Sequence, residues 1–215
     1  ASDLLPRAGG CEEPVSTASV TDKELVAQYA LQLGDDALIL SQRLSEWCAH
    51  SPELEEDVAL ANLALDLLGQ ARTLLTYAGS LESLEGRGRS EDDLAFLRTE
   101  REVRNVLLVE QPNGDFAVTI ARQLYFATYQ YELYTALCES TDLELAGLAA
   151  KAVKEVAYHR DHAVQWTLRL GDGTEESHRR RQAGLDPLLP DPAEPVAGGT
   201  GARPLAETGV PVDPR

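Results

Sequence analysis

The sequence of 215 residues is poor in cysteine and in positive charge. Its three cysteines, Cys11, Cys48 and Cys138, lie far apart and show no Cys-x-x-Cys spacing. An odd number of scattered cysteines argues against a disulfide framework and against a cysteine zinc site, and it is typical of the reducing cytoplasm. We therefore expect a cytoplasmic protein in which Cys48 and Cys138 are small buried hydrophobic side chains.

Basic residues are few: 19 of them face 36 acidic residues, which gives a formal net charge of -17. Such a chain is repelled by phosphate backbones and by anionic lipid surfaces, so neither nucleic-acid binding nor membrane association is expected. No run approaches the roughly 18 apolar residues that a membrane-spanning helix needs. The N-terminus also lacks the pattern of a signal peptide.

Three regions differ in composition. Residues 1–20 have mixed polarity and no periodicity, which predicts a flexible N-terminal arm. Residues 21–185 carry helical patterns throughout, with no alternating β pattern, and their length suits one domain. Residues 186–215 hold seven of the eleven prolines. We expect them to be a Pro/Gly-rich extension, or the truncated end of a last element.

Apolar residues recur every three or four positions within 21–185, and capping residues mark where helices begin. Thr21 and Glu24 have the spacing of a capping box, Ser90 and Asp93 repeat it, and Asp115 precedes another helix. Either Thr141 or Asp142 is the expected cap of the helix after that. The pattern predicts an all-α bundle of long antiparallel helices. The expected segments are 21–50, 52–79 (closed by Gly79), 90–97 continuing toward 109, 116–138, 142–170 and a shorter one after Thr174.

The second helix is informative because of what its inward face lacks. In iron-binding bundles, two helices each carry Glu-x-x-His, which places a carboxylate and an imidazole one turn apart. Here Leu67-Leu68-Gly69-Gln70 stands at that place. We expect Gln70 to hydrogen-bond another buried polar group, since an unpaired one costs about 1–3 kcal/mol. The inward stripe comprises Leu60, Leu63, Leu67, Gln70, Leu74 and Tyr77.

Three residues are the candidate metal ligands. Glu155 and His159 lie four apart on one helix, whereas the usual spacing is three, and Val156 occupies that position. Asp36 lies beside the inward Ala37 and is not itself on the inward stripe of its helix. Because two irons need about six protein ligands, we expect no metal, no cofactor and no catalytic residue in this chain, with His159 a hydrogen-bonded core histidine. The alternative is an autonomous metal-dependent oxidoreductase that uses Asp36, Glu155 and His159.

Two further features carry alternatives. His162 lies outside the inward stripe of its helix, so we expect it on the surface. The other interpretation is that His162 acts as a general base. His178 precedes Arg179, Arg180 and Arg181. This basic cluster is either a solvated helix end or a docking site for an acidic partner or a phosphate-bearing ligand such as coenzyme A.

Long stretches of the chain resemble the C subunits of bacterial phenylacetyl-CoA epoxidases, which are multicomponent monooxygenases of aerobic phenylacetate degradation. The resemblance covers roughly residues 21–190. The stretches that carry it are LGDDALILSQRLSEWCAHSPELEEDVALANLALDLLGQAR (33–72), NVLLVEQPNGDFAVTIARQ (105–123) and KAVKEVAYHRDHAVQWTLRLGDGTEESHRR (151–180).

The resemblance implies a ferritin-like, structural and non-catalytic subunit. Its implied partners are a sister A subunit of the same fold, which holds the di-iron centre and binds the acyl-CoA, and a small B subunit. A reductase supplies electrons from NADPH through flavin and iron–sulfur centres. The family normally ends in a further helix rich in Gly, Arg and His, whereas this chain has the Pro/Gly-rich segment 186–215.

The same resemblance locates the metal-ligand positions of the sister subunit in this chain. The glutamate of the sister's first helix falls on Ala37. Its first Glu-x-x-His falls on Leu67 and Gln70, and its second on Val156 and His159. Only one of these positions, His159, keeps a residue type that binds iron.

Overall fold

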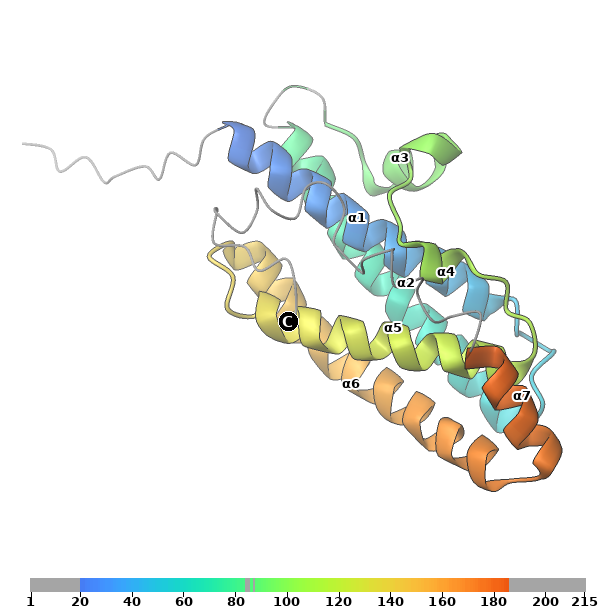
Figure 1. Ribbon diagram of the computed structural model, residues 1–215. Helices are drawn as coiled ribbons and strands as arrows, with labels where there is room; N and C mark the ends of the chain where they lie inside the picture. The colour runs from blue at the N-terminus through green and yellow to red at the C-terminus, as the bar shows by residue number, and fades with distance from the viewer. Residues whose placement is uncertain (1–19, 84–85, 87, 186–215) are drawn as a thin grey trace, which may run out of the picture.

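Two antiparallel pairs of long helices form the body of the molecule (Figure 1). The computed structural model describes residues 20–83, 86 and 88–185, and these contain no β-strand. The structure confirms the all-α, ferritin-like bundle. The first pair is α1 (Val20–Ser45) with α2 (Leu54–Ser83), and the second is α5 (Phe116–Leu137) with α6 (Leu143–Asp172). The expected arm, the C-terminal extension and Cys11 lie outside the described residues.

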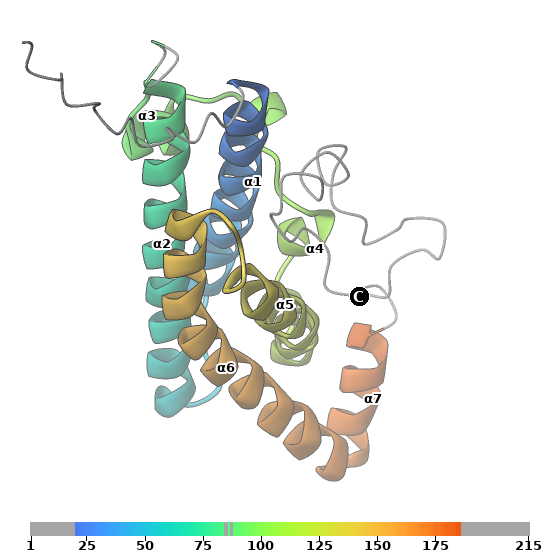
Figure 2. The ribbon, with the colours of Figure 1, turned by 90° about the vertical axis from the view of Figure 1, so that its left-hand side faces the viewer.

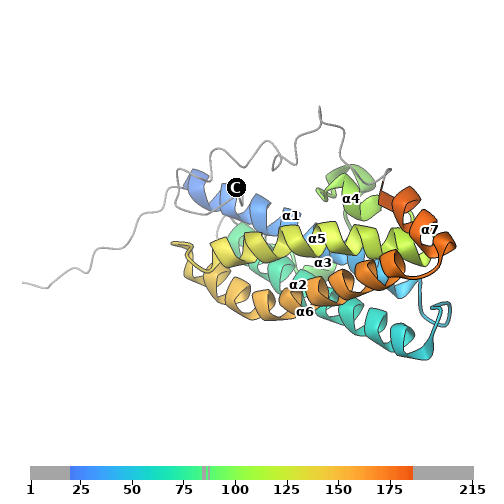
Figure 3. The same ribbon diagram turned by 60° about the horizontal axis from the view of Figure 1, so that its bottom comes forward.

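The two pairs make unequal contact with each other. Helices α1 and α2 pack along most of their length, as do α5 and α6, whereas α2 and α6 meet over a shorter stretch. Figure 2 shows why: α6 runs obliquely beside the upright α2 and diverges from it toward the base of the view. At that end α7 (Glu175–Leu185) turns back against α5 (Figure 3).

The long connection between the pairs is the part that the sequence predicted least well. Instead of one helix toward Val109, it holds α3 (Glu91–Phe96), a single 3₁₀ turn at Glu100–Glu102 and the short α4 (Leu107–Glu110). The physical reason lies on α1, where carboxylates accept hydrogen bonds from backbone N–H groups of this segment. Those amides are thereby unavailable to a continuous helix.

Helix ends depart from prediction at several places. α1 ends at Ser45 rather than near His50, and turns follow. α2 runs through Gly79 to Ser83, so Gly79 is not a helix terminator. Glycine is needed there because the backbone of Arg89 passes close to the helix. A Cβ at this position would lie 2.0 Å from the carbonyl oxygen of Arg89, and only glycine avoids that clash.

Three predicted N-terminal caps are present. The Ser90 side chain accepts from the Asp93 amide while the Asp93 carboxylate accepts from the Ser90 amide, which completes the capping box. Asp115 accepts from the Val118 amide at the start of α5. Asp142 caps α6 in the same manner. The Thr21 side chain lies outside the described part, and α1 begins one residue before it.

The predicted inward stripe of α2 is buried, with Tyr77 half-buried as its end. Two clusters of buried apolar residues fill the bundle, one around Leu33, Leu75 and Leu133 and the other around Leu40, Leu67 and Phe126. The expectation of two buried cysteines is wrong for Cys48, which is exposed in the turn after α1. Cys138 is partly buried at the end of α5.

Helix α2 is also long and apolar enough, by length and composition alone, to cross a membrane. Core helices of soluble proteins pass the same test, and 44% of the apolar stretch is buried inside the bundle. Four of its large apolar side chains, those of Leu54, Val58, Leu65 and Leu68, are exposed.

Candidate functional site

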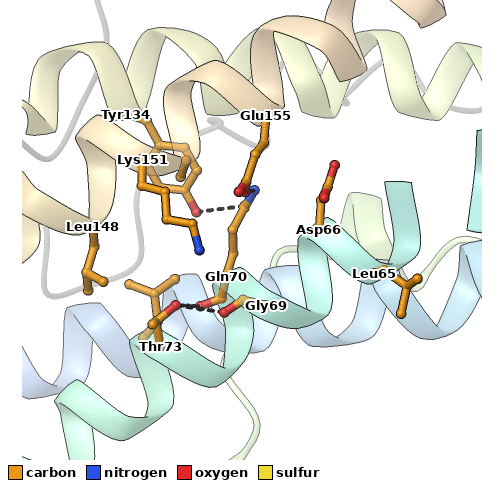
Figure 4. A pocket seen from close by; sticks show the side chains of 11 residues that line it. Leu65, Asp66, Gly69, Gln70, Thr73, Tyr134, Leu148, Lys151 and Glu155 are labelled. Carbon is orange, nitrogen blue, oxygen red and sulfur yellow. Dashed lines mark hydrogen bonds between the residues drawn. The ribbon is translucent and has the colours of Figure 1, made fainter. Parts of the chain in front are cut away.

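A small hollow of about 150 Å³ lies where α2 and α6 meet (Figure 4). Of the four positions onto which the sister's Glu-x-x-His motifs fall by resemblance, only Gln70 lines this hollow, whereas Leu67, Val156 and His159 do not. Its walls combine apolar and polar side chains from both helices and one tyrosine from α5. The lining residues are Leu65, Asp66, Gly69, Gln70, Thr73, Leu74, Tyr134, Leu148, Lys151, Ala152 and Glu155.

Gln70 is the centre of a hydrogen-bonded chain across this hollow. Its Nε2 donates to Oε2 of Glu155 at 3.0 Å, and its Oε1 accepts from the hydroxyl of Tyr134 at 3.4 Å (Figure 4). Burial raises the pKa of Tyr134, so the hydroxyl keeps its proton and remains a donor. The expectation that Gln70 binds other polar groups is confirmed.

His159 is 1% exposed, and its Nε2 lies 3.1 Å from Oδ2 of Asp66. Burial lowers the pKa of His159, although the neighbouring Asp66 acts in the opposite direction. The imidazole is therefore neutral near pH 7, with Nε2–H donating to the carboxylate. This is the buried, hydrogen-bonded histidine that the sequence indicates.

Asp36 serves a different part of the molecule. It is 2% exposed, and its Oδ1 accepts from the backbone N–H of Val106 at 2.7 Å. Burial is the main cause that raises its pKa to about 8, with a further contribution from the adjacent Asp35. A carboxyl group held largely protonated by its apolar surroundings is a poor metal ligand.

The residues present do not fit a di-iron centre. Asp36, Glu155 and His159 each bind a different partner, and the structure does not bring them together on one point. Across residues 20–83, 86 and 88–185, no three His, Cys, Asp or Glu side chains are placed to hold a metal ion. Ala37, Leu67 and Val156 are 0% exposed, so aliphatic side chains fill the remaining ligand positions.

His162 is a residue that sequence reasoning misplaced. Its side chain is 9% exposed rather than on the surface, and its Nε2 lies 2.8 Å from Oε2 of Glu56, which is itself nearly buried. Although His162 is not on the predicted inward stripe of α6, it faces the start of α2, where Glu56 lies. The only signal in the sequence was Glu56 itself, an acidic residue on a position that proves to be inward.

Arg179 and Arg180 of the basic cluster are exposed in the first half of α7. Arg179 and Arg180 both bind the carboxylate of Glu176 on the preceding turn of α7. The Nδ1 atom of His178 lies 3.2 Å from the carbonyl oxygen of Gly171. These contacts favour the solvated helix end over a docking site for a phosphate group.

Comparison with known proteins places these features in a family. The family model described as "Phenylacetic acid catabolic protein" matches residues 11–215. The chain belongs to this family. It is also 51% identical, over 187 residues, to the C subunit of 1,2-phenylacetyl-CoA epoxidase from Escherichia coli strain K12, and the match covers 87% of this chain and 74% of that protein.

Proposed function

We propose that this family member is the structural, non-catalytic subunit of a phenylacetyl-CoA 1,2-epoxidase, a monooxygenase of aerobic phenylacetate catabolism that uses NADPH and oxygen. Its task is to pair with a di-iron sister subunit of the same fold and to stabilise that subunit in an active form. The similarity to the C subunit of an epoxidase supports a role within a multi-subunit enzyme.

One observation carries the proposal: the positions at which a bundle of this kind binds iron are closed by other interactions. Leu67 and Val156 fill the interior with aliphatic volume. The polar groups that remain, Gln70 and His159, are engaged by Glu155 and Asp66. Because the chain has the helical bundle but lacks the metal ligands, we infer that its long helices serve as a surface on which a partner subunit packs.

The cofactors belong elsewhere in this proposal. The di-iron centre and the acyl-CoA site lie in the sister subunit, and flavin, iron–sulfur centres and NADPH belong to the reductase. The cytoplasmic assembly also includes a small B subunit. Neither nucleic acid nor a membrane is a partner.

Reconstitution tests the proposal directly. Mixing this chain with the sister subunit, the B subunit and the reductase should give epoxidation of phenylacetyl-CoA, and omitting this chain should abolish turnover or precipitate the sister. Elemental analysis of the purified subunits should find iron in the sister and none in this chain. Full turnover by the sister without this chain, or separate elution of the two from an equimolar mixture, would overturn the structural role.

The alternative of an autonomous metal-dependent oxidoreductase finds no support in a shared site, because Asp36, Glu155 and His159 bind separate partners. It makes an opposite prediction for the purified chain. About two irons per chain, together with an activity that is lost in His159→Gln, would establish it in place of the structural role.

A further inference from the structure

The outward side of α2 carries an apolar surface that nothing in the described part of the chain covers. Four large apolar side chains stand on it, at 76% exposure for Leu54, 55% for Val58, 63% for Leu65 and 46% for Leu68. Their spacing of four, seven and three residues keeps them on one side of the helix. We call these four residues the α2 outer face.

The middle of this face carries no exposed charged residue, although the protein is strongly acidic. From Val58 to Gly69 the other exposed residues are Asn62, Leu65 and Leu68, none of which is ionisable. The one carboxylate within this stretch, Asp66, has its Oδ2 atom 3.1 Å from Nε2 of His159, and exposed charges return only at the two ends, with Glu55 and Arg72. A solvent-facing helix surface ordinarily carries its charged residues on this side, so three turns without them mark a contact surface.

Two exposed lysines lie one turn apart on α6, and the first of them, Lys151, lines the hollow that also borders the α2 outer face. Lys151 and Lys154 are exposed on α6, and neither has an ion pair or hydrogen bond within the described chain. Lys151 lines the same hollow as Leu65 and Gly69 (Figure 4). They are two of only three lysines in a chain of net charge -17. Unpaired cations beside an apolar strip call for an occupant that brings carboxylates.

We propose that the α2 outer face, with Lys151 and Lys154 at its edge, is the surface on which the di-iron sister subunit docks. The docking element is an amphipathic helix whose apolar stripe packs on Leu65 and Leu68. Carboxylates flanking that stripe pair with the two lysines. This inference rests on the proposed function, and it adds where the contact lies and which chemistry the partner presents.

Charge favours this occupant over the alternatives. The α2 outer face is ~22 Å long and ~10 Å wide, so it supplies the apolar centre of an interface, and the adjoining surface of α6 supplies more of the ~800 Å² that one side of a standard interface buries. A second copy would bring two chains of charge -17 together. An anionic lipid surface is repelled by the same charge.

The test uses the full chain with the substitutions Leu65→Glu and Leu68→Glu together. Both residues are exposed, so the variant should keep the helicity and melting temperature of the parent. Affinity for the sister subunit, measured by competition against the tagged parent chain in the preformed complex, should fall at least about thirtyfold, as expected for two central apolar contacts. The control is Phe96→Glu with Leu97→Glu, which removes two exposed apolar residues from the region of α3 and should leave the affinity unchanged.

Charge reversal tests the chemistry of the partner. Lys151→Glu with Lys154→Glu should weaken binding by about tenfold at low salt and less at high salt, because edge charges act through screened attraction. The control is Lys23→Glu, which changes a lysine near the start of α1. An effect of Lys23→Glu as large as that of the double reversal would mean that net charge, rather than this surface, guides association.

The outcomes distinguish an error in the proposed docking surface from an error in the proposed function. If the unaltered chain fails to bind the sister, the structural role itself is overturned. If it binds and the double glutamate variant binds equally well, only the surface is wrong. Two further results would overturn the choice of occupant: a self-association lost in the glutamate variant while sister binding persists, or flotation with phosphatidylcholine vesicles that the same variant abolishes.

Discussion

Polar side chains are buried in two regions of this molecule, and the regions differ in how completely the groups are paired. On α1, Asp35 is 0% exposed, binds the guanidinium group of Arg98 with both oxygens and also accepts from the backbone N–H of Arg104. At the seam of α2 and α6, His159 and His162 each make one contact, and the Nδ1 atom of His162 is buried without a partner.

The comparison teaches that similar chemistry serves two purposes. The carboxylates of α1 replace the backbone partners that an irregular connection lacks, so they determine the path of residues 97–106. The seam residues join two helices whose backbone hydrogen bonds are already satisfied internally. Losing the first should disturb the connection as a whole, whereas losing one seam contact should cost only that contact.

The largest expected effect comes from rebuilding the ligand motif in the seam. Leu67→Glu with Gln70→His places a carboxylate among buried aliphatic side chains and breaks the bond from Gln70 to Glu155. We expect a loss of about 4–6 kcal/mol in the free energy of unfolding of the metal-free chain. Urea unfolding measures it. Leu68→Glu on the exposed side is the control, and a parent-like midpoint for the double variant would mean that the seam is misassigned.

Breaking the α1 cluster should cost slightly less. Asp35→Ala leaves the guanidinium group of Arg98, whose side chain is 4% exposed, buried without its carboxylate. The expected loss is about 3–5 kcal/mol in the free energy of unfolding. Asp92→Ala, on the exposed side of α3, should change it by less than about 0.5 kcal/mol. If Asp35→Ala also stays within that limit, the carboxylate does not hold the connection.

A single seam contact should matter less again. Glu56→Ala leaves the buried imidazole of His162 without its hydrogen-bond partner, so we expect a loss of about 1–3 kcal/mol. Hydrogen exchange should then show faster opening where α2 and α6 meet, with the amides of α3 unchanged. Equal acceleration in α3 would show that the two regions are not independent.

The two regions also differ in how their stability responds to pH. Burial raises the pKa of Asp36 to about 8, so the stability it contributes is complete below its unfolded value of about 4 and is lost as pH rises through 8. Asn at this position still accepts from Val106 and does not titrate. Asp36→Asn should therefore gain stability relative to the parent between pH 5 and pH 9, measured by thermal unfolding across that range.

His159, where α2 and α6 meet, changes the stability with pH in the opposite direction from Asp36. Burial lowers the pKa of His159, so its contribution is present above about 6.5 and is lost as pH falls below that value. His159→Gln should flatten the acid side of the stability profile and leave the alkaline side as it is. A profile unchanged on both sides would mean that His159 is not the group that titrates.

Much of the bundle followed from local patterns. The apolar steps of three and four predicted the long helices, and Ser90, Asp115 and Asp142 marked where three of them begin. Gln70 on an inward position was enough to predict a buried hydrogen bond, because an unpaired amide inside a bundle is costly. These conclusions needed only neighbours within one or two helical turns.

What required the tertiary structure was the identity of partners far apart in the chain. Asp35 meets Arg98 63 residues away, and Glu56 meets His162 106 residues away. The crossing of α2 and α6 decides both the burial of His162 and the exposure of Leu65. Periodicity states which side of a helix is apolar, but the direction in which that side points depends on how helices cross, and this is determined by packing between distant segments.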